Sequence, residues 1–343
     1  MSNYPPENIL HTMKIGVIGT GYWGPNIVRN LLALNQDVTI YDTDRSNLEN
    51  TYQKYHNCQC AGSLDDILLN PDITSVAIAV PLKSHCDLVI KSLKAGKHVF
   101  VEKSLCYSTD EADKIQIHLN GRILMVGHIT LFTRGILKAR ELITTNCIGK
   151  LTGISLARTH MGKVYPGIDV ATEVSSHDIA ILLFLINEMP VSVNAWGSSR
   201  LGLNKTDNAS IILRYEDTLT CTINVQWTSV IRERKMIVEG TSGTIICTTD
   251  TEKEELTLFD QQEAFEALKK GASPRDSMLK VKSRVLLQNE REPLYDELAG
   301  FLDCIKNNRL PLTDFGFGRK VVKIFEAIRK SVELNGKTVK IPW

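Results

Sequence analysis

The first motif of the sequence that could take part in binding or catalysis is a set of regularly spaced glycines. From Gly19 to Gly24 the chain reads Gly-Thr-Gly-Tyr-Trp-Gly, directly after the apolar run Lys14–Ile18 and before an amphipathic segment. A GxGxxG turn between a strand and a helix brings backbone N–H groups to a dinucleotide pyrophosphate, with the positive end of the helix dipole behind them. We therefore predict a dinucleotide-binding turn, the alternative being a glycine-rich turn with no ligand. Its residues are Gly19, Thr20, Gly21, Tyr22, Trp23 and Gly24.

Asp42 is the residue that could select the dinucleotide. It follows the apolar run Asp37–Tyr41, about 20 residues beyond the glycines, where a carboxylate accepts hydrogen bonds from the adenosine ribose. The same charge repels a 2′-phosphate, so we expect NAD as the cofactor rather than NADP. Arg45 lies close enough to weaken this argument. Alternatively, Asp42 is a turn carboxylate that caps the next helix.

A histidine, a glutamate and a lysine could handle the proton of a dehydrogenation. Removing hydride from a secondary alcohol leaves a hydroxyl proton, which needs a base of near-neutral pKa within hydrogen-bond reach. His177 is the best candidate, and Glu173 shares its face if Ala171–Phe184 is helical, so it could orient the imidazole. Lys103 follows the run His98–Val101 and could hydrogen-bond the reacting oxygen. The alternative is a surface pair and a solvated lysine.

The first part of the chain alternates short apolar runs with longer amphipathic ones, as repeated strand and helix units with a parallel sheet do. We therefore predict a doubly wound Rossmann domain over residues 13–128, preceded by a loose tail over residues 1–12. The predicted strands are Lys14–Ile18, Asp37–Tyr41, Ser75–Val80, His98–Val101 and Ile123–Gly127. The predicted helices are Pro25–Leu34, Ser46–His56, Ser63–Leu69, His85–Leu93 and Thr109–His118.

Beyond His128 the sequence turns to long alternating segments rich in Thr, Val and Ile. This predicts an α+β domain with a mostly antiparallel sheet over residues 129–343, and α/β as the class of the whole chain. Glu252–Arg291 is charged and weakly patterned, so we expect an irregular excursion. The predicted strands are Leu151–Arg158, Val191–Gly197, Ala209–Tyr215, Thr218–Gln226, Arg234–Glu239 and Gly243–Thr248. Amphipathic helices at Leu294–Asn307 and Gly316–Leu334 close the chain and could pack back on the first domain.

The composition is that of an ordinary soluble enzyme. The 343 residues include 40 Lys plus Arg against 39 Asp plus Glu, with a formal net charge of +1. This balance leaves no excess of positive charge that would indicate binding to nucleic acid or to an anionic membrane. The longest apolar stretch, Ile179–Ile186, is far short of the ~20 residues that span a bilayer. The cysteines are scattered without CxxC spacing, so we expect a cytoplasmic protein and no metal site.

Several motifs together resemble the Gfo/Idh/MocA sugar oxidoreductases, from about Met13 to the C-terminus. In the first domain the matching motifs are Gly16–Gly24, Val80-Pro81 with His85, and Ala95–Lys103. In the second, Glu173-Val-Ser-Ser-His177-Asp178 resembles the family's Asp-x-x-x-His site and Arg309–Asp314 its late loop. The motifs Gly127-His128, Ser176–Ile179 and Gln226-Trp227 are most similar to the branch that acts on nucleotide-linked sugars, such as UDP-N-acetylglucosaminuronate 3-dehydrogenases.

The resemblance implies roles for individual residues. Lys103 and His177 carry over to the catalytic centre with Glu173, and either of the first two could accept the proton. Two departures put the substrate's identity in doubt: Ser104 stands where proline is usual, which loosens the backbone, and Glu173 stands where Asp is usual. The remaining expected cofactor contacts are Val80, Pro81, His85, Glu102 and Lys103. The expected substrate contacts are Lys103, Arg158, Tyr165, Glu173 and His177.

The expected activity is NAD-dependent hydride transfer to or from a secondary hydroxyl of a sugar, and we expect the sugar to be nucleotide-linked. A glycosidase or lyase that oxidises transiently and returns the hydride is a second possibility within the resemblance. A non-catalytic nicotinamide or sugar sensor is a third. The resemblance also implies a homo-oligomer, either a dimer or a tetramer. The charge balance predicts no nucleic-acid or membrane partner.

Overall fold

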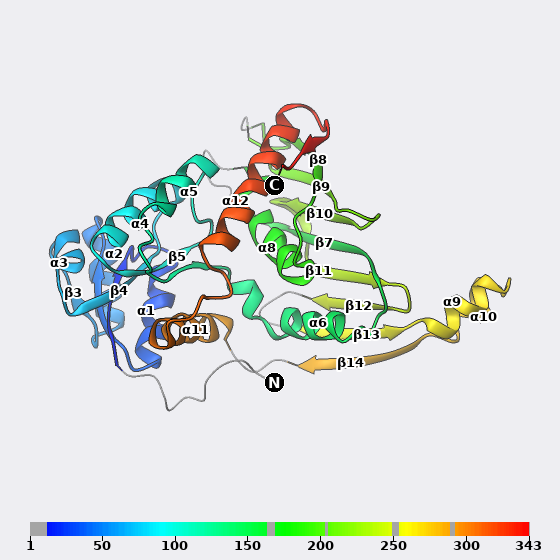
Figure 1. Ribbon diagram of the computed structural model, residues 1–343, viewed down its shortest axis with the longest axis horizontal. Coiled ribbons are helices and arrows are strands. Elements are labelled where there is room, and N and C mark those ends of the chain that lie inside the picture. The colour runs from blue at the N-terminus through cyan, green and yellow to red at the C-terminus, as the bar shows by residue number, and fades with distance from the viewer. Residues whose placement is uncertain (1–11, 163–168, 203–204, 249–253, 289–291, 343) are drawn as a thin grey trace. The chain divides into compact units, whose positions relative to one another are not determined.

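The structure is a computed structural model that describes residues 12–162, 169–202, 205–248, 254–288 and 292–342 (Figure 1). The chain divides into two compact units. The first takes the chain up to Ile129 together with Glu292–Val322, and the second takes Thr130–Arg291 together with Lys323–Trp343.

A parallel sheet of six strands forms the centre of the first unit. Its strands are β1 (Lys14–Ile18), β2 (Asp37–Tyr41), β3 (Gln59–Cys60), β4 (Ile73–Ile78), β5 (His98–Glu102) and β6 (Leu124–Gly127). They lie in the order β3-β2-β1-β4-β5-β6, and all neighbours are parallel. Val17 of β1 pairs with Ile40 on one side and Ala77 on the other. This strand order is that of a Rossmann fold, so the predicted fold is confirmed.

Most helices of the first unit connect its strands, and two more come from the C-terminal part of the chain. They are α1 (Gly24–Ala33), α2 (Arg45–Lys54), α3 (Leu64–Leu68), the short 3-10 helix η1 (Leu82–Ser84), α4 (His85–Lys94), α5 (Thr109–Gln116), α11 (Pro293–Asn307) and the first part of α12 (Phe315–Glu333). Local signals fix their starts: Ser63 caps α3 in a capping box, and the Ser108 hydroxyl accepts from the Glu111 N–H at the start of α5. α11 packs on α1, and Arg29 pairs with Glu292 at 2.6 Å.

Apolar strand residues supply the core of the first unit. Val17, Ile78 and Val101 are fully buried or nearly so, as expected of parallel strands covered on both faces. The loop before α12 adds to the sheet beside β6, where the Thr313 hydroxyl donates to the Val126 carbonyl at 2.6 Å and the Val126 N–H donates to the Thr313 carbonyl at 2.8 Å. The late loop of the sequence is thereby held against the edge strand.

A sheet of nine strands forms the second unit. Its strands are β7 (Leu151–Met161), β8 (Ser192–Ser198), β9 (Asn208–Arg214), β10 (Thr220–Gln226), β11 (Thr228–Gly240), β12 (Gly243–Thr248), β13 (Glu255–Asp260), β14 (Lys282–Gln288) and β15 (Val339–Lys340). Their order is β14-β13-β12-β11-β7-β10-β9-β8-β15. The neighbours are antiparallel except β7 and β10, which are parallel. The predicted mostly antiparallel sheet is confirmed.

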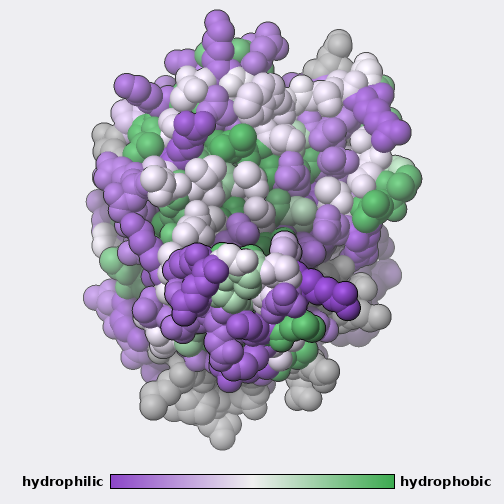
Figure 2. Space-filling model, turned by 90° about the vertical axis from the view of Figure 1, so that its right-hand side faces the viewer, coloured by the Kyte–Doolittle hydropathy of each residue, from purple (hydrophilic) through white to green (hydrophobic). Residues whose placement is uncertain are grey.

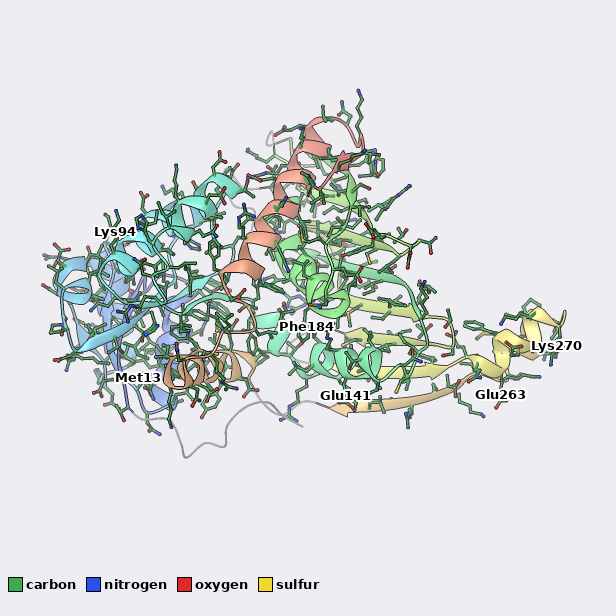
Figure 3. All side chains as sticks on the ribbon, in the orientation of Figure 1. Met13, Lys94, Glu141, Phe184, Glu263 and Lys270 are labelled. Atoms are coloured by element: carbon green, nitrogen blue, oxygen red, sulfur yellow. The ribbon has the colours of Figure 1, made fainter. Side chains whose placement is uncertain are left out.

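Three helices of the second unit precede most of its strands in the chain. After the short 3-10 helix η2 (Ile129–Phe132) come α6 (Arg134–Thr144), α7 (Val170–Glu173) and α8 (Ser175–Ile186). α8 contacts β7 and β10, whereas α6 contacts β12 and β13. The two helices also touch: Arg140 of α6 donates to the Leu185 carbonyl at 2.5 Å, and its guanidinium lies 5.5 Å from the centre of the Phe184 ring. Figure 3 labels Glu141 on α6 and Phe184 on α8.

The excursion over residues 252–291, expected to be irregular, consists of regular elements in its described part, residues 254–288. β13 and β14 pair as antiparallel strands, and α9 (Gln262–Lys269) and α10 (Pro274–Met278) lie between them. This arm projects from the second sheet in Figure 1, and Figure 3 labels Glu263 and Lys270 at α9. Figure 2 looks onto the side from which the arm projects, where both hydrophilic and apolar residues appear. The charged residues blurred the periodic signal of these elements, which is why the prediction was wrong.

Two helix predictions also differ from the structure. No helix was expected at Arg134–Thr144, where α6 lies. The single helix expected at Ala171–Phe184 is divided into α7 and α8, although Val174 between them keeps helical torsion angles and its N–H donates to the Val170 carbonyl at 3.1 Å. None of the helices in the described part of the chain has the length and apolarity needed to cross a membrane.

Candidate active site

The glycine turn leaves the first sheet at the carboxyl end of β1. Gly19 has a φ of +95°, and a Cβ atom there would lie 2.5 Å from the Ala79 carbonyl oxygen. A Cβ atom on Gly24 would overlap the Gly19 carbonyl oxygen, so glycine lets α1 start close to the turn. At Gly21 the nearest neighbour of such an atom would be Asn47 Nδ2 at 3.8 Å. The turn is therefore tight where it must bend and open where a pyrophosphate would approach.

The start of α1 is suited to an anion. Trp23 occupies the N-cap position without a side-chain cap, Pro25 lies in the first turn, and that turn contains no acidic residue. The positive end of the helix dipole therefore meets no carboxylate of its own first turn. Tyr22 is 89% exposed, whereas Thr20 is buried. These features fit a dinucleotide pyrophosphate at this helix start.

Asp42 lies beside the glycine turn at the carboxyl end of β2. Its Oδ2 accepts from the Thr20 N–H at 2.6 Å and the Thr20 hydroxyl at 3.2 Å, while its Oδ1 accepts from the Asp44 N–H at 2.9 Å. The cap of α2 is Asp44, whose side chain accepts from Ser46. The alternative in which Asp42 itself caps that helix is therefore wrong. Asp42 is thus fixed against the turn through both of its oxygens, and its contact with the ribose stays a prediction.

Replacing Asp42 by Asn should weaken NADH binding about 10-fold and move the preference towards NADPH. The amide keeps an acceptor oxygen but removes the charge that strengthens hydrogen bonds to ribose hydroxyls and repels a 2′-phosphate. Fluorescence titrations with NADH and NADPH measure both affinities. Asp44→Asn is the matched control, because it alters the neighbouring carboxylate, which caps α2, and should leave the NADH to NADPH ratio unchanged. An unchanged ratio in Asp42→Asn would contradict the assignment.

His85 links the ends of two neighbouring strands. It is 1% exposed, and its ring nitrogens contact the Ser104 carbonyl at 2.7 Å and the Val80 carbonyl at 2.8 Å. In either neutral tautomer the ring donates one N–H to one of these two carbonyls. Ser104 is buried and its carbonyl is held, so this stretch is anchored although it lacks the proline of the family motif. Pro81 precedes η1, in the same connection between β4 and α4.

Lys103 immediately follows β5, at the edge of the sheet where the glycine turn and Asp42 also lie. The lysine is half-buried, and its N–H donates to Glu102 Oε2 at 3.3 Å. His128, which follows β6, is completely buried. Its ring packs edge to face against Phe317, with ring centroids 5.6 Å apart. Burial and the charge of Lys103 lower the pKa of His128 to about 3. Lys103 therefore has a neutral imidazole as its neighbour at neutral pH.

Glu297 on α11 is a buried carboxyl group that sequence reasoning missed. It is completely buried, and burial together with the charge of Glu102 raises its pKa well above the usual value, which the His128 backbone N–H opposes. A signal was present, because Glu297 belongs to the apolar stripe formed by Leu294, Leu298 and Phe301 at helical spacing. A carboxyl group in such a stripe indicates a special environment.

Glu297→Gln should stabilise the protein by about 1–3 kcal/mol at pH 8. Because the pKa of Glu297 is raised in the folded state, the unfolded chain releases a proton that the folded chain keeps. The stability of the native protein therefore falls as the pH rises above the unfolded value of 4.5 and levels off above the folded pKa. The glutamine variant lacks this loss, so its advantage should shrink towards pH 4.

Thermal unfolding of both proteins between pH 4 and pH 8 measures the predicted difference. Glu333→Gln at the exposed end of α12 is the control and should show no pH-dependent difference. If the difference in stability between Glu297→Gln and the native protein did not depend on pH, its cause would be packing and not ionisation.

His177 lies in the first turn of α8 and is half-buried. Glu173 is the last residue of α7, so its backbone precedes His177 by one helical turn across Val174. The side chain of Glu173 lies outside the described part of the chain, and so does the whole of Tyr165. Their expected roles stay predictions.

Arg158 and Asp178 form a buried ion pair in the second unit. Arg158 Nη2 lies 2.9 Å from Asp178 Oδ1, and Nε lies 3.2 and 3.3 Å from the two carboxylate oxygens. Both side chains are nearly inaccessible, at 6% and 2% exposed. Burial raises the pKa of Asp178, and the Arg158 guanidinium opposes this rise. Arg158 thus fixes the start of α8, next to His177.

The expected site residues fall into two groups. The glycine turn, Asp42, Val80, His85 and Lys103 lie along the carboxyl ends of β1, β2, β4 and β5 in the first unit. In doubly wound sheets ligands bind at this edge, where the strand order reverses between β1 and β4. His177 and Arg158 belong to the second unit, at the start of α8 and the end of β7.

The first unit is thus a dinucleotide-binding Rossmann unit with a lysine at its ligand edge. Similarity to known proteins shows to which class of protein the chain belongs. Residues 13–128 match the oxidoreductase family with an NAD-binding Rossmann fold, and residues 136–246 match the GFO/IDH/MocA C-terminal domain. The chain belongs to the Gfo/Idh/MocA oxidoreductase family.

Relatives in this family carry several names. The chain is 24% identical to UDP-N-acetylglucosamine 3-dehydrogenase of Acidithiobacillus ferrooxidans, over 94% of this chain and 97% of that protein. It is 25% identical to 2,7-anhydro-N-acetylneuraminate hydratase of Mediterraneibacter gnavus, over 69% of this chain and 67% of that protein. Among solved structures, levoglucosan dehydrogenase in complex with NADH and levoglucosan superposes with a TM-score of 0.84 at 16% identity, covering 97% of this chain and 100% of the other.

Proposed function

We propose that this protein is an NAD-dependent dehydrogenase acting on a secondary hydroxyl of a sugar, and that the sugar is nucleotide-linked. The observation that carries the proposal is the position of Lys103, which shares the ligand edge of the Rossmann sheet with the glycine turn and Asp42. The name of the Acidithiobacillus ferrooxidans relative, which aligns along nearly the whole chain, supports a nucleotide-linked sugar.

The chain's residues supply binding and proton transfer. NAD, when bound, accepts the hydride from the carbinol carbon. We assign to the Lys103 ammonium a hydrogen bond to the reacting oxygen, where it stabilises negative charge that develops as the proton leaves. His177 is assigned as the base, because an imidazole is an effective proton acceptor near neutral pH. The neutral His128 beside Lys103 adds no competing charge.

A panel of sugars tests the proposal. Purified protein is incubated with NAD and with UDP-N-acetylglucosamine, its uronate, UDP-glucose, myo-inositol and levoglucosan, while the absorbance of reduced nicotinamide is followed. We expect turnover with at least one UDP-sugar and a lower rate with the free sugars. Silence with every compound, in protein that binds NADH, would count against a dehydrogenase.

A second candidate is a lyase or hydratase that oxidises its substrate transiently and returns the hydride. The observation that favours it is the name of the Mediterraneibacter gnavus relative. Reduced cofactor would then not accumulate. Incorporation of deuterium from solvent next to the leaving group, without net redox change, distinguishes this candidate from the dehydrogenase.

A further inference from the structure

One face of α2 is turned towards the glycine turn. Thr51 of this helix is buried, and its hydroxyl donates to the Thr20 carbonyl at 3.3 Å. Asn47 lies four residues earlier, so its side chain projects from the same face of the helix. The Asn47 Nδ2 atom lies 3.8 Å from the position that a Cβ atom on Gly21 would occupy. The amide group of Asn47 is therefore next to the middle glycine of the turn.

Buried hydrogen bonds fix α2 and the glycine turn to each other. Thr20, the residue before Gly21, is 2% exposed and is held from two sides. Asp42 accepts from its N–H at 2.6 Å and from its hydroxyl at 3.2 Å, and Thr51 donates to its carbonyl. The position of the half-buried Asn47 beside Gly21 is thus set by the packing of the helix on the turn.

The backbone next to Asn47 offers open hydrogen-bond donors. Within the residues that the structure describes, none accepts a hydrogen bond from the Gly21 N–H or the Tyr22 N–H. The first turns of α1 and α2 contain no acidic residue. The carboxylates that follow β2, Asp42 and Asp44, accept hydrogen bonds from Thr20 and Ser46. An anion at Gly21 therefore meets donors and the positive end of the α1 dipole.

We propose that the side-chain amide of Asn47 donates a hydrogen bond to the pyrophosphate of bound NAD, so that α2 holds the cofactor together with α1. The second glycine of such a turn is where the pyrophosphate approaches the backbone. Gly21 has no side chain in the space between its backbone and the amide, and an amide N–H bonds well to a charged phosphate oxygen. The proposal concerns the cofactor and goes beyond the proposed function, because it does not depend on the sugar.

Equilibrium binding of NADH, NADPH and ADP-ribose to the full-length protein tests the proposal without turnover. Asn47→Ala removes the donor, and Asn47→Asp puts a carboxylate of nearly the same shape in its place. Asn50→Ala and Asn50→Asp are the matched controls, because Asn50 is an exposed residue of the same helix. Fluorescence titrations measure the two reduced cofactors, and calorimetry measures ADP-ribose. An aspartate in the first turn of a helix interacts favourably with the dipole, so Asn47→Asp should keep its melting temperature.

We expect Asn47→Ala to bind all three ligands about 10-fold more weakly. Asn47→Asp should bind them at least about 30-fold more weakly, because it also repels the pyrophosphate, and added salt should reduce this difference. An equal loss for NADH and NADPH places the contact away from the ribose 2′ position. An equal loss for ADP-ribose places it outside the nicotinamide half. The Asn50 variants should bind like the native protein.

Three results would overturn the proposal. Native affinities in both Asn47 variants would exclude the contact, and a loss that the Asn50 variants share would assign it to α2 in general. A loss for only one of NADH and NADPH would assign Asn47 to the ribose.

The binding result and the turnover result are separable. Weaker binding in the Asn47 variants of a protein that oxidises no sugar would support the Asn47 contact and contradict the proposed dehydrogenase. Oxidation of a UDP-sugar together with native cofactor affinity in both Asn47 variants would support the dehydrogenase and contradict the contact.

Discussion

Lys103→Met is expected to lower kcat by about 10²–10⁴-fold with the sugar that the panel identifies. Methionine keeps the length of the side chain but removes the ammonium group that would hydrogen-bond the reacting oxygen. NADH binding should change less than about threefold, since the pyrophosphate and ribose contacts of the glycine turn and Asp42 are untouched. Stopped-flow absorbance of reduced nicotinamide gives kcat, and fluorescence titration gives the NADH affinity.

Lys94→Met is the matched control for this prediction. Lys94 is exposed at the end of α4 in the same unit, and its loss should alter neither quantity (Figure 3). A kcat that falls equally in both variants would point to a general effect of lost charge. A large loss of NADH affinity in Lys103→Met alone would assign the lysine to cofactor binding instead of catalysis.

His177→Asn should produce a similar loss of kcat, because asparagine cannot accept the proton near neutral pH. If Lys103 and His177 act on one hydroxyl as a unit, the double variant should lose little more than the worse single variant. Multiplicative losses would instead assign them to independent steps. Unchanged rates in the double variant would exclude both residues from the chemical step.

The first unit was predictable because its signals are local. β1 and β2 have the predicted bounds, since each is a short apolar run followed by a turn residue. The glycine turn is equally local, because φ at Gly19 and the contact between Gly24 and Gly19 arise within six residues. Parallel strands then bring Asp42 and Lys103 to the same edge, so residues distant in sequence could be grouped from topology alone.

The parts that sequence reasoning missed depend on contacts between distant segments. Glu102, His128 and Glu297 come from three elements, and nothing in any one of them indicates that they are neighbours. β14 is mostly exposed where its side chains are described, so it lacks the alternation that marks a half-buried strand. Arg158 was expected to contact substrate, and the expectation from sequence could not include its partner Asp178, twenty residues away on another element.

Asp178→Ala should destabilise the second unit by about 3–5 kcal/mol, the largest stability effect we expect. The alanine leaves the Arg158 guanidinium buried at 6% exposure without the carboxylate that compensates its charge. Removing both charges should cost much less, because no uncompensated ion remains. Asp178→Ala combined with Arg158→Met is therefore expected to recover most of the loss. Urea unfolding followed by tryptophan fluorescence measures the free energy of each variant.

The exposed pair of Lys150 and Asp217 provides the control for this experiment. Its atoms are 3.6 Å apart, and the side chains are 71% and 81% exposed, so Lys150→Ala should leave the unfolding midpoint unchanged. A double variant as unstable as Asp178→Ala alone would mean that packing around the carboxylate, and not an uncompensated charge, causes the loss. Recovery in the double variant together with a lower rate of hydride transfer would indicate that the pair also positions His177, because Asp178 adjoins that residue in the first turn of α8.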